Sequence, residues 1–296
     1  MLTQMVTGLL STMELKKTHK TNTSIDFNNL SNKHLSIQLS LDGFSFCIIN
    51  KNEMQIERLE HFRFNDHSPT PDKLLQNVES VFKKERALQK RYGSTNITHV
   101  NQLSTLVPKS LFDEDRIRDY LKFSSKTYTN DYVVHDEIEN HDMVNVYIPF
   151  VNVNNFFLER FGSFEYKHFS TVLVNNLLNT FKFSEHPHMF AHIGERQFEI
   201  LVIANNKLLF YNSFDYQSKE DFIYYILFTA EQLALNPEKF ELILAGIIDT
   251  ESELYKIAYR YVRKVGLMEN RSEYKFPPTS KETTKRRHFT LLNQYS

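Results

Sequence analysis

The chain has 296 residues, which is enough for one large core or for two domains of ordinary size. Lys and Arg (35) almost balance Asp and Glu (36), and the net charge of −1 argues against a general attraction to nucleic acid or to an anionic membrane. The single cysteine, Cys47, excludes an internal disulfide, and its apolar neighbours predict a buried, unreactive thiol. We find no run of 18 apolar residues and no secretion signal, so we expect a cytoplasmic protein without a membrane span.

The first part of the chain predicts a mobile leader followed by a β-hairpin. Residues 1–33 are rich in Thr, Ser and Asn, which is typical of mobile segments. Apolar residues alternate with polar ones in residues 34–41, and residues 44–49 form an apolar run. Asp42-Gly43 separates these two strands, and Asp-Gly is a strong signal for a hairpin turn.

A third strand, two helices and a fourth strand are predicted next. Residues 54–64 have strand character, and residues 72–92 carry apolar side chains at helical spacing up to Gly93. Residues 97–107 predict a strand that is stopped by a proline. Residues 113–123 predict a helix with an acidic first turn.

The middle of the chain predicts an acidic connector followed by alternating strands and helices. Residues 131–142 carry five acidic side chains and two histidines, and we expect a solvated loop without fixed carboxylates. Residues 144–150 and 164–169 predict strands. Residues 155–161 and 171–181 predict helices.

The second half repeats the opening pattern. Three strands are predicted first, at residues 189–193, 198–203 and 208–214. Ser218 and Asp221 have the spacing of a capping box, which would open a helix running to Leu235. A strand at residues 240–244 and a helix at 251–265 complete the pattern.

The order strand–turn–strand–turn–strand–helix–strand therefore occurs twice, in residues 34–107 and 189–244. Aligning Gly43 with Gly194 matches the strands and helices of the two copies. Residue identity between the copies is low, so the match is one of pattern. The alternative is two unrelated α/β segments that share a common motif.

This pattern resembles the actin-like ATPase superfamily, whose two lobes each carry a ribonuclease-H-like sheet. Residues 161–214, which begin FGSFEYKHFSTVLVNNLL, look most like the cytoplasmic actin-like proteins of type IV pilus and type II secretion assembly. The whole chain also resembles a family of uncharacterised proteins from Bacteroidetes-type bacteria with this fold, and HFTLLN at residues 288–293 fits that family.

The resemblance implies an α/β class with a duplicated ribonuclease-H-like (actin-like ATPase) fold, in which mixed sheets are flanked by helices. It implies lobe one at residues 34–162, lobe two at residues 163–270 and a C-terminal tail at residues 271–296. Within that tail, we expect a solvated basic segment before a docked apolar end.

The resemblance also implies a nucleotide site between the lobes, where hairpin turns bind phosphates and a carboxylate holds hydrated Mg²⁺. The matching residues are Asp42, Gly43 and Ser45 in lobe one, Gly194 and Glu195 in lobe two, and Gly246 near the adenosine. For Asp42 and Gly43, a plain hairpin turn is the competing interpretation, and for Gly246 a strand-to-helix turn.

The match departs from the superfamily at two positions in lobe two. His192 stands where the family places an aspartate, and a neutral imidazole does not replace a carboxylate toward Mg²⁺-bound water. Glu195 places a negative charge where phosphate oxygens would lie. These departures favour a pseudo-ATPase, and no catalytic residue is assigned.

Two further clusters are weaker candidates for chemistry. His186, His188 and His192 are close in sequence, but a strand spaces them too widely for one metal ion, so we expect surface or loop histidines and no metal site. The basic residues of the tail are a modest signal for RNA, and nucleic acid is not an expected partner.

We therefore expect a non-catalytic or weakly nucleotide-binding scaffold that binds a protein partner, by analogy with the pilus-assembly relatives in a groove of lobe one. The alternative is an active Mg-ATP-dependent ATPase or phosphotransferase, with ATP and Mg²⁺ as cofactors. An RNA-associated accessory protein is a third hypothesis.

Overall fold

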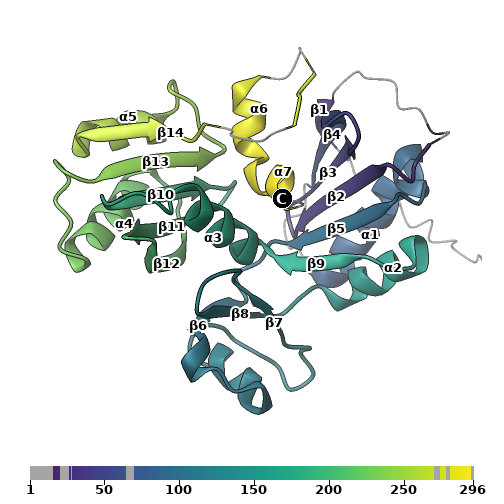
Figure 1. Cartoon of the computed structure of the whole chain (residues 1–296), viewed down its shortest axis with the longest axis horizontal. Helices are drawn as coiled ribbons and strands as arrows, with labels where there is room; N and C mark the ends of the chain where they lie inside the picture. Colours follow the sequence, from purple (N-terminus) through teal and green to yellow (C-terminus); the bar gives the residue numbers. More distant parts are fainter. Residues whose placement is uncertain are drawn as a thin grey trace, which may run out of the picture.

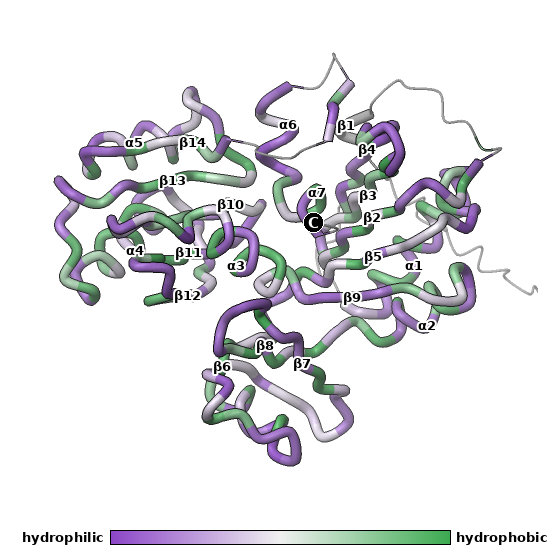
Figure 2. Tube along the Cα trace, viewed as in Figure 1, coloured by the Kyte–Doolittle hydropathy of each residue, from purple (hydrophilic) through white to green (hydrophobic). Residues whose placement is uncertain are grey.

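The computed structural model describes residues 16–20, 27, 29–64, 70–269, 274–277 and 281–294. Figure 1 shows two α/β lobes side by side, each built on its own sheet, with a smaller unit below them. The predicted α/β class with two mixed sheets flanked by helices is thus confirmed. Figure 2 shows that the strands carry much of the hydrophobic sequence, which they bury in the cores of the lobes.

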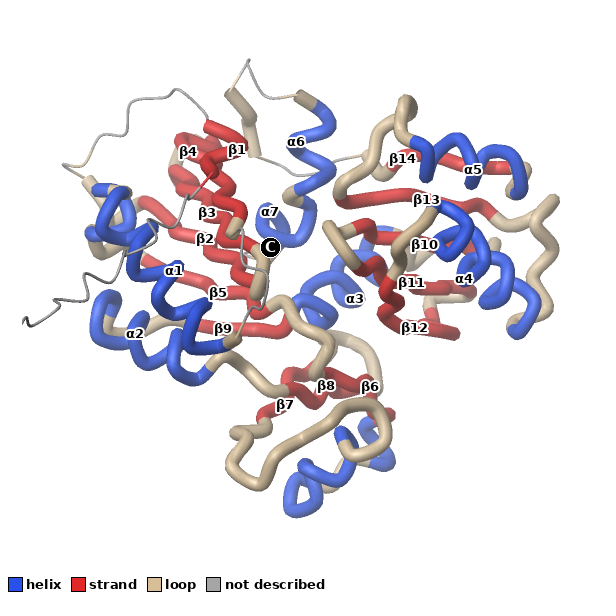
Figure 3. Tube along the Cα trace, turned by 180° about the vertical axis from the view of Figure 1, so that it is seen from behind, coloured by secondary structure: helices blue, strands red, loops and turns tan. Residues whose placement is uncertain are grey.

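Lobe one is built on a six-stranded sheet in the order β1-β4-β3-β2-β5-β9. Its strands are β1 (Lys16–Lys20), β2 (Lys33–Ser40), β3 (Gly43–Asn50), β4 (Gln55–Arg63), β5 (Ser94–His99) and β9 (Glu165–His168). Helices α1 (Pro71–Lys84) and α2 (Val151–Phe161) cover one face, as Figure 3 shows from behind. Cys47 lies on the opposite face, where its predicted burial is confirmed and where burial raises the pKa of its thiol.

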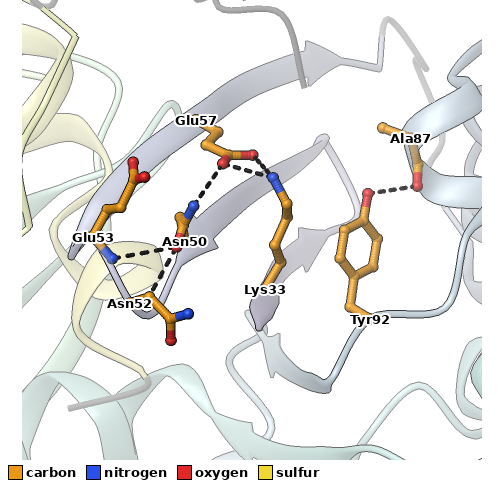
Figure 4. Close-up of polar contacts among 7 residues, drawn as sticks. All are labelled: Lys33, Asn50, Asn52, Glu53, Glu57, Ala87 and Tyr92. Atoms are coloured by element: carbon orange, nitrogen blue, oxygen red, sulfur yellow. Dashed lines mark hydrogen bonds and ion pairs between the residues drawn. The ribbon is translucent and has the colours of Figure 1, made fainter. Parts of the chain in front are cut away.

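The β3–β4 turn of lobe one is fixed by a polar cluster (Figure 4). The Asn50 side-chain oxygen accepts backbone N–H groups of Asn52 (3.2 Å) and Glu53 (3.3 Å). The Glu57 carboxylate accepts hydrogen bonds from the Asn50 side-chain amide at 3.1 Å and from the buried Lys33 ammonium at 2.5 Å. This ion pair satisfies a lysine that is only 3% exposed.

Lobe two is built on a five-stranded sheet in the order β12-β11-β10-β13-β14. Its strands are β10 (His188–Ile193), β11 (Gln197–Ala204), β12 (Lys207–Asp215), β13 (Glu241–Gly246) and β14 (Lys264–Leu267). Helices α4 (Lys219–Gln232) and α5 (Glu253–Tyr261) pack on one face, and α3 (Phe169–Thr180) packs on the other. The predicted capping box of Ser218 and Asp221 opens α4.

The smaller unit contains a three-stranded sheet in the order β6-β8-β7. Its elements are β6 (Ser104–Pro108), β7 (Val134–Glu137), β8 (Met143–Tyr147) and the 3-10 helices η2 (Lys109–Leu111) and η3 (Glu114–Leu121). Val107, Leu121, Val144 and Val146 form its core. The predicted helix at residues 113–123 is therefore a 3-10 helix.

The last two helices, α6 (Glu282–Arg287) and α7 (Phe289–Asn293), lie between the lobes (Figure 1). Leu291 and Leu292 pack on the lobe-one sheet, whereas Phe289 packs with residues of α3 and lobe two. The C-terminal segment thus contributes to the cores of both lobes.

The two copies of the internal repeat have the same strand order and equivalent backbone hydrogen bonds. The orders β4-β3-β2-β5 and β12-β11-β10-β13 are the same, and in each the last pair is parallel. The residue after the third strand donates to the hairpin turn in both copies, from Phe64 N to Asp42 O (2.8 Å) and from Tyr216 N to Arg196 O (3.2 Å). Asp42 therefore corresponds to Arg196.

This register corrects the alignment of the two copies. The pair that closes the first hairpin is Ser40 with Gly43, and Gly194 with Gln197 closes the second. Gly43 therefore corresponds to Gln197, and its alignment with Gly194 was wrong by three residues. In the same register, His99 and Gly246 occupy equivalent ends of β5 and β13.

Several predicted elements have different limits in the structure. Helix α1 ends at Lys84 because the backbone of Glu85 turns extended, and its carboxylate pairs with Arg58. The η1 turn (Arg86–Gln89) follows it. The single strand predicted for residues 97–107 is two strands, β5 and β6, which belong to different sheets. Between them, the Asn101 side chain accepts the Leu103 amide at 2.8 Å and turns the chain.

Three strands were not predicted. Strand β7 lies within residues 131–142, where a solvated loop was expected. Strand β14 follows α5, so the helix predicted for residues 251–265 ends at Tyr261. Strand β1 pairs with β4 and lies inside residues 1–33, the segment expected to be a mobile leader. Most of residues 1–32 lies outside the described residues. Each of these strands is short and is specified by its pairing partner.

Candidate functional site

The hairpin tip of lobe one holds three of the six predicted site residues. Ser40 Oγ donates to Asp42 Oδ1 at 2.5 Å, so part of the Asp42 carboxylate is used inside its own turn. Ser45 Oγ lies 2.8 Å from His61 Nδ1. A Cβ at Gly43 would lie 3.1 Å from the His61 ring, so glycine leaves room for that imidazole.

The hairpin tip of lobe two is tied to both lobe one and α6. Glu195 accepts from Arg63 of β4 at 3.3 Å and from Arg287 of α6 at 2.9 Å. The Gly194 carbonyl accepts the Tyr216 hydroxyl at 2.9 Å. The Glu195 carboxylate therefore links the two lobes through opposite charges.

Gly246 ends β13 where the chain passes closest to β10. Its φ is +84°, and a Cβ there would lie 2.1 Å from the Ile193 carbonyl oxygen. Only glycine fits this backbone without a shift of one strand. The strand-turn role of Gly246 is thus sufficient to explain the residue.

A cavity of about 330 Å³ lies next to Gly246, between lobe two and α6. Its walls are His61 of lobe one, residues 246–249 and Ser252 of lobe two, and Thr283, Thr284, Arg287 and His288. Gly246 lines it directly, whereas Ser45 and Glu195 reach it through their partners His61 and Arg287. The structure therefore brings together parts of the predicted site around this cavity.

The basic end of the C-terminal segment is held by lobe two. Arg286 donates to the carbonyl oxygens of Ile248 (3.0 Å) and Met268 (3.2 Å). Further along, Thr290 Oγ1 donates to Gln38 of lobe one at 2.7 Å. We expected this basic segment to be solvated. Instead, Arg286 and Arg287 are half-buried and contact lobe two.

Sequence reasoning missed a fixed carboxylate at Asp136. Its oxygens accept the backbone N–H of His168 (2.8 Å), the Thr171 hydroxyl (2.7 Å) and the Tyr147 hydroxyl (2.9 Å). Burial raises the pKa of this carboxyl, while the three donors oppose that shift. The available signal was the β-branched pair before it, Val133 and Val134, which favours a strand. The carboxylate joins β7, β8 and α3, which is a structural role.

Two of the three clustered histidines are not surface residues. His192 is 8% exposed, stacks edge-on against Phe169 and lies 3.2 Å from the Glu199 carboxylate. His188 lies 3.1 Å from Glu241. Within the described ranges, no group of three His, Cys, Asp or Glu side chains could hold a metal ion.

Known proteins with a similar sequence or structure were found for this chain. Residues 22–265 match the family described as "Protein of unknown function (DUF3822)", so α6 and α7 follow the matched region. A Bacteroides thetaiotaomicron protein of unknown function with an actin-like ATPase fold is 26% identical, with a TM-score of 0.73 over 83% of this chain and 94% of that one.

The PilM-PilN type IV pilus biogenesis complex contains a second similar structure, which is 12% identical with a TM-score of 0.59 over 88% of this chain and 96% of that one. Among curated proteins, no sequence matches the chain. In the part of the chain that the structure describes, no helix is long and apolar enough to cross a membrane. The fold of the chain is that of the actin-like ATPases.

Proposed function

Since the chain belongs to the DUF3822 family and has an actin-like ATPase fold, we propose that it is a scaffold that binds a protein partner, without catalysis and with weak or no binding of nucleotide. The proposal rests on one observation. The chain's own C-terminal segment packs between the lobes: Leu291 and Leu292 lie in the core of lobe one, Phe289 packs with α3 and lobe two, and Thr290 donates to Gln38.

The charges at the two hairpin tips support this proposal. Glu195 already pairs with Arg63 and with Arg287, of which Arg287 lines the cavity, so these cations are partly neutralised toward phosphate oxygens. The Glu195 carboxylate itself repels an anion. The turn position equivalent to Asp42 in lobe two is Arg196, so a second carboxylate for Mg²⁺ is missing at that position.

A protein partner is supported by the fold comparison. A protein of similar fold occurs in a complex of two pilus-biogenesis proteins, so this two-lobed architecture is compatible with work as a binding surface. The alternative is an active Mg-ATP-dependent ATPase or phosphotransferase. The cavity beside Gly246 and Asp249 favours that alternative, because it has room for a small polar ligand.

Thermal unfolding with and without millimolar Mg-ATP tests the proposal. A ligand at 100 times its Kd adds about 2.7 kcal/mol of stability, which is several degrees of Tm for a chain of this size. We expect no such shift. Asp42→Ala is the site variant, and Asp72→Ala removes an exposed carboxylate of α1 as a matched control.

A shift of several degrees that Asp42→Ala abolishes and Asp72→Ala keeps would overturn the scaffold proposal and support the alternative. ATP turnover would then be the next measurement.

A further inference from the structure

A groove of about 450 Å³ separates lobe two from the smaller unit. One wall is formed by residues 208–213 of β12. The other is formed by Asn101 and Gln102, by residues 104–106 of β6 and by Ser124. Each of these strands is at the edge of its sheet, since β12 pairs with β11 and β6 with β8. Figures 1 and 3 both show the ends of β6 and β12 next to each other.

The free edge of β12 presents backbone hydrogen-bonding groups to the outside of the sheet. Tyr216 N donates inward to Arg196 O, and because the direction alternates along a strand, the amides of Tyr211 and Ser213 point outward. The Ser213 amide donates to the Asn212 side-chain oxygen at 2.9 Å and not to a strand, so an added strand would replace this local bond. An outward row of this kind is a template for another strand.

Charged residues and proline on an edge strand are two features that discourage pairing with a further strand. Strand β12 is nine residues long, and between Lys207 and Asp215 it carries neither charge nor proline. Leu209 on this edge is 49% exposed. Between its charged ends this edge has one irregularity, a register shift opposite Val202 and Ile203, and an uncharged stretch of edge strand is a site for strand addition.

The groove beside this edge has no charged side chain in its lining. It combines amides and hydroxyls with apolar residues of β12, and the Ser213 hydroxyl has no hydrogen-bond partner within the described residues. One end is closed by Gln102, whose amide donates to Gln197 (2.9 Å) and Asp215 (2.8 Å). A charged segment would lose its hydration there without compensation, whereas an uncharged one would not.

We propose that this groove binds an extended, uncharged segment of a partner protein, which adds as a strand to the free edge of β12. The proposal rests on the scaffold function, and it places the partner's contact between lobe two and the smaller unit, whereas the sequence comparison led us to expect a groove of lobe one. The groove follows residues 208–213 of β12, which sets the paired part of the segment at about six residues, or roughly 20 Å of extended chain.

The probe is a displayed library of random nine-residue peptides, selected on the full chain. Selected peptides are synthesised, and their Kd is measured by fluorescence anisotropy. We expect sequences poor in charge and rich in β-branched residues. N-methylation of the alternate residues that face β12 weakens binding at least tenfold, because it removes main-chain donors, whereas methylation of the other alternate set has a smaller effect.

Leu209→Lys is the groove variant, because a lysine on an edge strand blocks pairing. Leu158→Lys on α2 is its matched control, since that leucine is similarly exposed at 55%. We expect Leu209→Lys to weaken the selected peptides at least tenfold and Leu158→Lys to leave their Kd unchanged. Because both positions are exposed, we expect neither substitution to change the Tm. The Tm of each variant is measured to verify that it folds.

The proposal is overturned if the library yields no binder, or if binders tolerate Leu209→Lys and both methylation patterns equally. These failures are separate from failure of the scaffold function. A natural partner that binds wild type and Leu209→Lys alike retains the scaffold and eliminates the groove. A nucleotide-dependent Tm shift would refute the scaffold function, and the groove would still be judged by the peptide measurements alone.

Discussion

Single positions in this chain are best understood by what surrounds them. Gly246 and Gly162 both have a positive φ, +84° and +83°, which disfavours any residue with a side chain. At Gly162, a Cβ would meet nothing within 4 Å, whereas at Gly246 it would lie 2.1 Å from a backbone oxygen of β10. The sequence alone indicates that both are turn glycines. It cannot tell which one tolerates a side chain less, because the atom that a side chain at Gly246 would contact belongs to another strand.

Gly246→Ala should therefore cost more stability than Gly162→Ala. The left-handed backbone costs about 1 kcal/mol in either variant. At Gly246, displacement of the neighbouring strand adds about 1–3 kcal/mol. Urea unfolding of the two variants measures the difference, and equal losses would contradict the close approach of β13 to β10.

Among the elements, those with local signals were predictable and those defined by distant partners were not. The hairpin of β2 and β3 and the capped helix α4 follow from Asp42-Gly43 and Ser218, which act on their immediate neighbours. Strands β1, β7 and β14 have 4 or 5 residues each, and their pairing partners specify them. In the candidate site, Arg287 meets Glu195 across 92 residues, and no local pattern encodes such a contact.

Helix α7 should contribute to the stability of the whole fold although it has only five residues. Leu291 is fully buried against lobe one, so Leu291→Ala should lose about 2–5 kcal/mol. Leu111→Ala, at a leucine that is 69% exposed, should change stability by less than about 0.5 kcal/mol. Urea unfolding compares them, and similar stability of both variants would show that α7 does not dock in solution.

At the scale of the whole molecule, buried histidines make stability depend on pH. Burial lowers the pKa of His34 and of His99 to about 4, and burial with nearby His99 lowers the pKa of His168 to about 3. The unfolded chain protonates these rings near pH 6.5, but the folded chain does not. Stability is therefore complete above pH 6.5 and is lost as the pH falls toward 4.

Between pH 7.5 and 5.5, each of these rings should lower the free energy of unfolding by about 1.4 kcal/mol, or about 4 kcal/mol for the three together. Urea unfolding at the two pH values measures this loss. In His99→Gln, about one third of it should disappear. A free energy of unfolding that is the same at both pH values would contradict the burial of these rings in neutral form.

The position of α6 and α7 also has a consequence in time. Both helices follow strands β1 to β14 in the chain, so the ribosome makes them after the two sheets. At about 5–20 residues per second, the residues between β14 and the end of α7 take on the order of a few seconds to synthesise. During that interval the apolar surfaces that Phe289, Leu291 and Leu292 later cover are exposed on the nascent chain.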